Sequence, residues 1–163
     1  MKDRSRQAPP AANAQFGVPI ESALARRERL ADRYDYAFGQ ERIFAELVAA
    51  LLEEVPAGKN VLEVGAAAGL LTRPLLRNAK SLTALEPSPG MLRRLLESDV
   101  ANDPRLGTMQ GMVEDLTDAA FFDVAVVTFT PRRGVGLLTL LSELGGHVSD
   151  RIVMLLDDDG SMD

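Results

Sequence analysis

The fold is decided by the stretch VLEVGAAAG, residues 61–69. Its first four residues form a mostly apolar run of strand length, and the loop that follows contains only Gly and Ala. A helical pattern begins after the loop. Small residues let backbone groups approach a ligand closely, and the first N–H groups of a helix are free to bind one. The stretch therefore predicts a strand, a ligand-binding turn and a helix.

The same change from strand to helix recurs along the rest of the chain. Helical segments separate the apolar runs, and Ser88-Pro89 supplies an N-cap with Pro at the first helical position. Such alternation is typical of a parallel sheet with right-handed crossovers. We therefore expect a doubly wound α/β fold, with a mainly parallel sheet of about five strands and helices on both faces. The expected strands are residues 60–64, 81–85, 105–110, 123–128 and 151–156.

The segment before this core has a different composition. Residues 1–20 are rich in Pro, Ala, Asn and Gln, which predicts a flexible arm. Residues 21–58 predict N-terminal helices, and the clearest covers 40–55, where apolar residues recur at every fourth position until Pro56. Residues 59–163 would form a ligand-binding core, in a single domain with these helices.

Composition excludes several kinds of site. The 163 residues include no Cys and one His, which excludes a disulfide framework, a thiolate nucleophile and a Cys-ligated or multi-histidine metal site. We expect no metal. Residues 61–163 carry nine basic and fifteen acidic side chains and so account for the net charge of -6. An acidic body repels phosphate backbones, so nucleic acid is a disfavoured partner. No apolar run reaches the roughly 18 to 20 residues of a membrane span, so we expect a cytoplasmic protein without membrane contact.

The spacing of the loop restricts the nucleotide-type ligand that it can bind. A dinucleotide fingerprint needs glycines at the first, third and sixth positions, which are here Gly65, Ala67 and Leu70. No Gly-Lys-Ser/Thr follows, which excludes a phosphate-cradling loop. What remains is an acid at the end of each of two strands, Glu63 and Glu86. Glu86 lies twenty-one residues after Gly65, about where an acid accepts hydrogen bonds from ribose hydroxyls.

Four segments follow one another in a specific order and spacing: EVGAAAG (63–69), LEPSPGML (85–92), QGMVEDL (110–116) and FDV (122–124). Together they resemble the class I S-adenosylmethionine-dependent methyltransferase family, over roughly residues 34–128. The resemblance implies a Rossmann-like core, S-adenosylmethionine as the cofactor, and methyl transfer to an acceptor that we expect to be small or flexible. The sulfonium is already a good leaving group, so little acid-base machinery is needed, and no catalytic residue is assigned.

The resemblance also implies which residues contact the cofactor. Those at its methionine end would be Glu63, Gly65, Ala67 and Gly69. Glu86 would bind the ribose. Those around the adenine would be Met91 or Leu92 on one face, with Val113 and Glu114 at the edge.

Three features depart from the family pattern. Ala67 stands where the family usually has its middle glycine, and its methyl would weaken cofactor binding by ~1 to 3 kcal/mol if nothing moves. Met112 replaces a residue that is often acidic, so binding of the adenine amino group would pass to Glu114 or Asp115. The sequence stops at Asp163, past the expected fifth strand, whereas the family sheet usually continues with two more strands.

These departures keep two alternatives open. One is a non-catalytic methyltransferase-like binding module, and the other is a fragment of a longer methyltransferase. A fragment would expose one edge of its sheet, which favours a homo-oligomer through that edge.

A few polar residues are candidates for the substrate side of the site. They are Tyr34, Tyr36, Thr128 and Arg132, and for each the alternative is an ordinary structural or solvated role. Arg132 would hold an anionic group, because guanidinium pairs bidentately with carboxylate or phosphate. His147 precedes the fifth strand, on the amino-end side of the sheet, so we expect no catalytic role for it.

Overall fold

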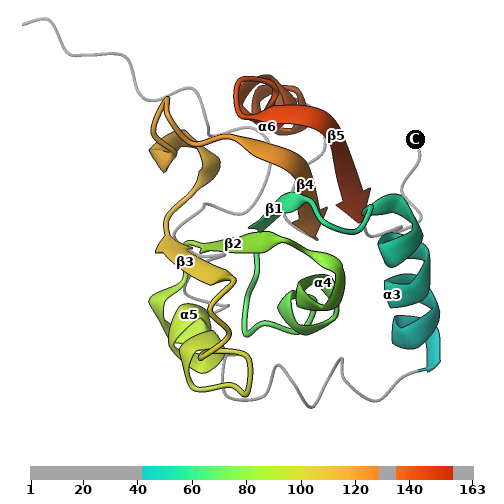
Figure 1. Ribbon diagram of the computed structural model, residues 1–163. Coiled ribbons are helices and arrows are strands. Elements are labelled where there is room, and N and C mark those ends of the chain that lie inside the picture. Colours follow the sequence, from blue (N-terminus) through green and yellow to red (C-terminus); the bar gives the residue numbers. More distant parts are fainter. Residues whose placement is uncertain (1–41, 129–134, 156–163) are drawn as a thin grey trace, which may run out of the picture.

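A parallel sheet organises the part of the chain that the structure, a computed structural model, describes: residues 42–128 and 135–155. Its strands are β1 (Asn60–Val64), β2 (Ser81–Glu86), β3 (Leu106–Gln110), β4 (Phe122–Thr128) and β5 (Val148–Leu155). They lie in the order β3-β2-β1-β4-β5, and every neighbouring pair is parallel (Figure 1). The predicted doubly wound α/β fold is therefore confirmed.

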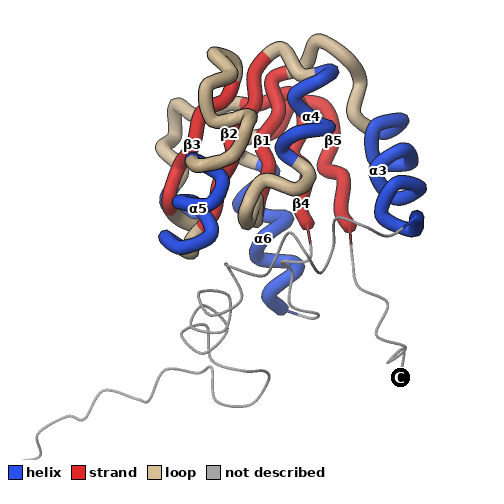
Figure 2. The backbone as a smooth tube through the Cα atoms, turned by 90° about the horizontal axis from the view of Figure 1, so that it is seen from below, coloured by secondary structure: helices blue, strands red, loops and turns tan. Residues whose placement is uncertain are grey.

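Helices cover both faces of this sheet. One face carries α3 (Arg42–Glu54), α4 (Thr72–Asn78) and α5 (Pro89–Leu96). The other carries α6 (Val135–Gly145) and the short 3-10 helix η2 (Val113–Asp115). Figure 2 shows α4 and α5 in front of the strands and α6 behind them. Because successive side chains of a strand point to opposite faces, Val61 packs in the α3-α4-α5 layer and Leu62 in the α6 layer. Both are buried, which explains the continuous apolar runs in the sequence.

The strand order determines where a ligand can bind. The chain passes from β1 outward to β2 and β3, and then returns to place β4 on the other side of β1. The order therefore reverses between β1 and β4, and ligands of open α/β sheets bind outside the carboxyl ends of the strands at such a point. The register brings these ends together: Val64 lies opposite Leu85 and Val127, and Glu86 lies opposite Gln110.

Element boundaries differ from the sequence expectations mainly at the last strand. β5 begins at Val148, three residues before the expected start. The polar residues Ser149 and Asp150 hide this part of the strand in the sequence, because both are exposed in the structure and Asp150 is ion-paired with Lys59 and Arg151. The helix expected over 40–55 is present as α3, and the expected N-cap is present, since the Ser88 hydroxyl accepts a hydrogen bond from the Met91 N–H (3.2 Å).

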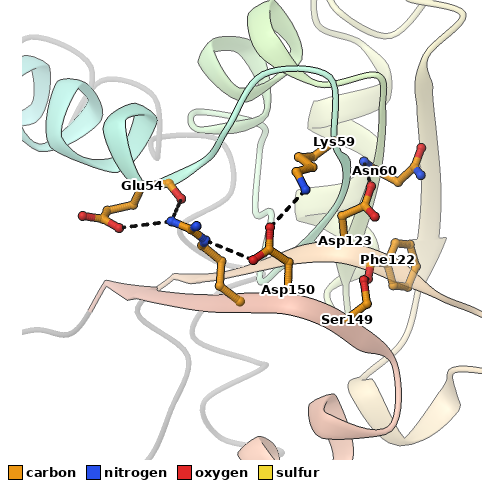
Figure 3. A network of polar contacts seen from close by, with 8 residues as sticks. Glu54, Lys59, Asn60, Phe122, Asp123, Ser149 and Asp150 are labelled. Carbon is orange, nitrogen blue, oxygen red and sulfur yellow. Dashed lines mark hydrogen bonds and ion pairs between the residues drawn. The ribbon is translucent and has the colours of Figure 1, made fainter.

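A network of polar contacts lies at the amino ends of the strands (Figure 3). Lys59 Nζ lies 3.0 Å from Asp150 Oδ2, and the Asn60 N–H donates to Asp123 Oδ2 at 2.7 Å. Arg151 donates to the backbone carbonyl of Glu54 at 3.4 Å, which links β5 to the end of α3. Exposed ion pairs contribute at most about 1 kcal/mol each, so the network aligns elements more than it stabilises the fold.

His147 also lies at the amino ends of the strands. Its Nδ1 lies 2.9 Å from the Ala120 carbonyl oxygen, and its own carbonyl accepts from the Phe122 N–H. This position is at the opposite end of the strands from the expected ligand site, as the sequence indicates. In the described ranges, no helix is both long and apolar enough to span a membrane.

Neighbouring leucines on α5 provide a test of this packing. Leu95 is fully buried in the core between the helices and the sheet, whereas Leu96 is 51% exposed. We expect Leu95→Ala to lower the free energy of unfolding by about 2 to 5 kcal/mol, because it leaves a cavity in the core. Leu96→Ala, the matched control on the same helix, should change it by less than about 0.5 kcal/mol. Urea unfolding followed by circular dichroism measures both, and similar losses in the two variants would contradict the layer arrangement.

Candidate functional site

The loop after β1 has an unusual backbone. Gly65 (φ 81°), Ala67 (φ 50°) and Gly69 (φ 93°) all have left-handed conformations, and Ala67 is the one non-glycine residue with positive φ in the described ranges. A side chain at Gly69 would collide with Leu95 of α5, so that position needs glycine for space as well. Ala67, in contrast, keeps its methyl in a conformation that costs an L-residue roughly 1 to 2 kcal/mol.

Glu86 fixes this loop. It is the last residue of β2 and is 1% exposed. Its Oε2 accepts a hydrogen bond from the Ala67 N–H (2.9 Å), and its Oε1 accepts one from the Ser88 N–H (2.8 Å). Each carboxylate oxygen has the capacity to accept a further hydrogen bond. Glu86 thus joins the turns that follow two adjacent strands, at the position expected for the ribose contact.

Glu63 lies beneath the same loop. Its side chain is fully buried on the α4 face of β1, and its Oε2 accepts a hydrogen bond from the Thr72 hydroxyl (2.6 Å). Within the described residues, its second oxygen, Oε1, has no hydrogen-bond partner. Burial raises the pKa of the Glu63 carboxyl to about 8, the Thr72 hydrogen bond lowers it, and the negative charge of Glu86 raises it. Glu63 is therefore mostly a neutral acid at pH 7.

The residues expected around an adenine ring come from α5 and η2. Met91 is buried and packs against Ala68 and Ala67 of the loop, whereas Leu92 packs into the core beneath α4. Of the two alternatives for the ring face, Met91 is the one that the structure brings to the loop. Val113 is buried in the α6 layer.

The acids of the β3 turn have different environments. Asp115 Oδ2 accepts a hydrogen bond from the Met112 N–H (2.8 Å) and so stabilises its own turn. Glu114 is exposed and makes no hydrogen bond within the described part of the chain. Met112 has no carboxylate to offer an adenine amino group, and of the two neighbouring acids Glu114 is the one whose carboxylate is available.

Thr128 ends β4 beside the loop. Its hydroxyl donates to the Gly65 carbonyl (3.1 Å), and the side chain is buried. This contact joins β4 to the turn after β1, so the structure gives Thr128 a structural role in addition to any substrate contact. The other candidates for the substrate side, Tyr34, Tyr36 and Arg132, lie outside the described residues.

Two partners of the site acids are not evident as such from the sequence. Thr72 is a polar residue in an apolar stretch at the start of α4, and the signal for its role is its place directly after the glycine loop. The sequence indicates Ser88 as a helix cap, but its N–H is also a partner of Glu86.

The polar groups at the carboxyl ends of β1 and β2 fit S-adenosylmethionine. Two buried acids, Glu63 and Glu86, suit a ligand with cationic groups and ribose hydroxyls, and the orphaned Glu63 Oε1 leaves one of them unsatisfied. The loop sequence from Gly65 to Thr72 contains no basic side chain to bind a phosphate. Glu63 and the loop backbone would hold the methionine part, and Glu86 the ribose.

The strained backbone at Ala67 predicts opposite effects of two glycine substitutions. Ala67→Gly should raise the free energy of unfolding by about 0.5 to 1 kcal/mol, because glycine adopts φ near 50° without a steric cost. Ala68→Gly, next to it but without positive φ, should lower the same quantity by about 1 kcal/mol through lost burial and added backbone freedom. Urea titration of both variants measures the difference, and a shift of the same sign in both would refute the strain at Ala67.

The raised pKa of Glu63 predicts a pH-dependent stability of the ligand-free protein. The folded pKa of about 8 exceeds the ordinary value of 4.5, so the stabilising effect of the neutral acid is complete below pH 4.5 and is lost as the pH rises toward 8. One such group contributes a slope of about 1.4 kcal/mol per pH unit. Glu63→Gln should remove this contribution.

Urea unfolding at several pH values between 5 and 8 measures that slope in the wild type and in Glu63→Gln. The control is Glu53→Gln, on the exposed side of α3, which should retain the wild-type profile. Parallel profiles for the wild type and Glu63→Gln would show that Glu63 is ionised across this range.

Comparison with known proteins identifies the family. The family model described as "Methyltransferase domain" matches residues 61–142, which is half of the chain. A ribosomal RNA small subunit methyltransferase A from Novosphingobium aromaticivorans is 36% identical over 90 residues, which cover 53% of this chain and 33% of that protein. The chain thus matches about one third of the length of this curated relative.

Solved structures share the fold. The complex of DhpI with SAH has a TM-score of 0.67 at 23% identity and covers 85% of this chain and 70% of that one. The N-methyltransferase NodS from Bradyrhizobium japonicum, in complex with S-adenosylhomocysteine, has a TM-score of 0.65 at 20% identity, with coverage of 78% and 67%. Taken with the family match, the sheet order and the loop after β1, these findings show that the chain belongs to the class I S-adenosylmethionine-dependent methyltransferase family.

Proposed function

We propose that the chain binds S-adenosylmethionine at the carboxyl ends of β1 and β2 and transfers its methyl group to a small or flexible acceptor. The observation that carries this proposal is the buried Glu86 carboxylate, held by the Ala67 and Ser88 N–H groups where a ribose would be bound. The cofactor supplies an activated methyl group on a sulfonium. Residues 59–163 would form the core that binds it.

The remaining cofactor contacts follow from the environment of each residue. The methionine part would be surrounded by Glu63, Gly65, Ala67 and Gly69. Met91 would pack on the adenine ring, and the carboxylate of Glu114 would accept a hydrogen bond from the adenine amino group. DhpI and NodS were solved with SAH and S-adenosylhomocysteine respectively, and this supports the choice of ligand. Both structures are below 25% identity, so the argument depends on the family match and on the buried acids.

The chain would promote transfer mainly by alignment. Holding an acceptor and the methyl group in line contributes up to roughly 7 to 11 kcal/mol in well-oriented intramolecular reactions. A base is not required for a neutral amine acceptor. Thr128 lies at the end of β4 and is the described candidate on the acceptor side; Tyr34, Tyr36 and Arg132 complete the set as predictions.

Two classes of methyl acceptor are compared, nucleic acid and a small or flexible molecule. The curated relative is named for ribosomal RNA, which suggests nucleic acid as the acceptor. The net charge of -6 opposes phosphate-backbone binding, and for this reason we favour a small or flexible molecule. A transfer assay with radiolabelled cofactor, offered RNA in one arm and small amines in another, distinguishes them.

A non-catalytic binding module is the alternative function. The strained Ala67 favours it, because its methyl occupies a position where the family usually has glycine and where close ligand approach is needed. Such a module would bind the cofactor, or have lost it, without transferring methyl groups to any acceptor. The homo-oligomer predicted through an exposed edge of the sheet also stays a prediction. Among the described strands, β5 is an edge strand that pairs only with β4.

Calorimetric titration with S-adenosylmethionine and S-adenosylhomocysteine tests the proposal directly. We expect micromolar binding by the wild type and binding at least about tenfold weaker by Glu86→Ala, which removes a buried charged acceptor worth about 1.5 to 3 kcal/mol. Because the Ala67 and Ser88 N–H groups also lose their partner, Glu86→Ala should lower the stability of the free protein as well.

Glu97→Ala provides the control, since Glu97 is an exposed acid just after α5. It should leave both affinity and stability unchanged. Titrations are made at a temperature where circular dichroism shows each variant folded. No binding of either ligand up to millimolar concentration by the wild type would refute the proposed function, and equal affinities of wild type and Glu86→Ala would move the ribose contact elsewhere.

A further inference from the structure

Glu63 makes fewer contacts than a buried charge requires. Its carboxyl is fully buried, and its one hydrogen bond is the 2.6 Å contact from the Thr72 hydroxyl to Oε2. Oε1 has no partner within the described residues. A buried ionised carboxylate is costly unless it is paired, so such a group normally protonates.

The elements packed around Glu63 offer it no positive charge. Across the sheet its neighbours are Ala84 on β2 and Val126 on β4, both apolar. Glu86, two residues after Ala84 on the same face, is negative and makes ionisation of Glu63 harder. Helix α4 contributes the neutral Thr72.

The other two elements on this face add no cation either. Helix α5 contributes apolar side chains such as Leu95 to the same layer, and α3 contributes apolar side chains such as Leu51. The nearest cation along the chain, Lys59, is paired with Asp150 at 3.0 Å. Arg73 on α4 is half-exposed and paired with Asp99 at 2.6 Å. Among the described residues, the compensating charge for Glu63 is therefore missing.

We propose that Glu63 is a neutral carboxylic acid in the free protein and that a cationic group of the bound cofactor displaces its proton into solvent. Cofactor binding would then be coupled to the release of a proton. In the bound state the carboxylate of Glu63 faces the positive charge of the cofactor in a buried environment, where no solvent screens the pair. This inference rests on the proposed function and adds a charge requirement to it: the site recognises its ligand partly by the cation.

The pKa of Glu63 supports the starting state. Burial raises it to about 8, so about nine in ten molecules carry this proton at pH 7. An opposite charge within about 4 to 6 Å lowers the pKa of an acid by about 1 to 3 units. At pH 7, between about half and nearly all of the protons present on Glu63 before binding should therefore be released.

The coupling predicts how affinity depends on pH. A ligand that releases a proton binds more tightly as the pH rises, by up to about tenfold per pH unit while the free protein still carries the proton. The affinity of the wild type should therefore increase between about pH 6 and 8 and level off above pH 8. A site in which Glu63 is already ionised has no such dependence on this group.

Two groups of the cofactor could act as the cation, the sulfonium and the amino group of its methionine part. Both are present in S-adenosylmethionine, whereas S-adenosylhomocysteine lacks the sulfonium. Titration with the two ligands separates them. A smaller proton release with S-adenosylhomocysteine assigns the effect to the sulfonium, and an equal release assigns it to the amino group.

The experiment is calorimetric titration of the full chain at pH 7 in buffers of low and high ionisation enthalpy, such as phosphate and Tris. The slope of binding enthalpy against buffer ionisation enthalpy gives the number of protons released. We expect about 0.4 to 0.9 proton per S-adenosylmethionine for the wild type. Glu63→Gln mimics the neutral acid and has no proton to release at this position. Its proton release should therefore be smaller than that of the wild type by this amount, whereas any proton lost by the ligand itself is released with both proteins.

The outcomes separate this inference from the proposed function. Absence of binding in every buffer refutes the proposed function. Binding with no difference in proton release between wild type and Glu63→Gln overturns the inference alone. If Glu63→Gln does not fold or binds too weakly, Thr72→Val replaces it: removal of the Thr72 hydrogen bond raises the pKa of Glu63, so the affinity should level off at a higher pH. An unmoved pH profile overturns the inference in that case.

Discussion

The arrangement of the turns at the carboxyl ends of the strands depends on the hydrogen bonds of Glu86. Its two oxygens bind N–H groups of the turns after β1 and β2, and its backbone carbonyl accepts from Gly111 after β3. One buried residue thus joins the ends of three neighbouring strands. The bond to the Ala67 N–H also holds that residue at φ 50°, a conformation it would otherwise avoid. The arrangement is formed before any ligand is present, and ligand hydroxyls would meet acceptors already in place.

Two acids share this edge but experience different environments. Glu86 is surrounded by N–H donors, which stabilise a negative charge, whereas Glu63 has one hydroxyl donor and apolar neighbours across the sheet. Like charges close together in a buried site cannot both ionise easily, so the negative charge of Glu86 raises the pKa of Glu63 and favours its neutral form. This difference explains why the two strand-end acids, similar in the sequence, suit different parts of a ligand.

The sequence predicts most of this fold because the central strands β1, β2 and β4 are largely buried on both faces and are rich in apolar residues. It is least informative where polar residues belong to a strand, as at Ser149 and Asp150, which the structure places in β5 and of which Asp150 is paired with Lys59. The position of Glu63 and Glu86 at the carboxyl ends of β1 and β2 is also predicted by their spacing. Their chemistry is not, since the partner of Glu63 is Thr72, nine residues later on a separate element, and its missing second partner is a property of packing.

Ala67 shows how far a glycine motif depends on glycine. The loop keeps left-handed backbone at alternate residues 65, 67 and 69, although only the first and last are glycine. Gly69 is required for space, because a side chain there would meet Leu95, but the surroundings of Ala67 accept a methyl group, which packs near Met91. The loop keeps this conformation with alanine at its middle position because the Ala67 N–H donates to Glu86 and backbone hydrogen bonds hold the residues on either side. The methyl group of Ala67 leaves less room for a ligand beside the loop but does not alter the loop backbone. Any change in ligand preference would therefore come from the shape of the site and not from loss of the fold.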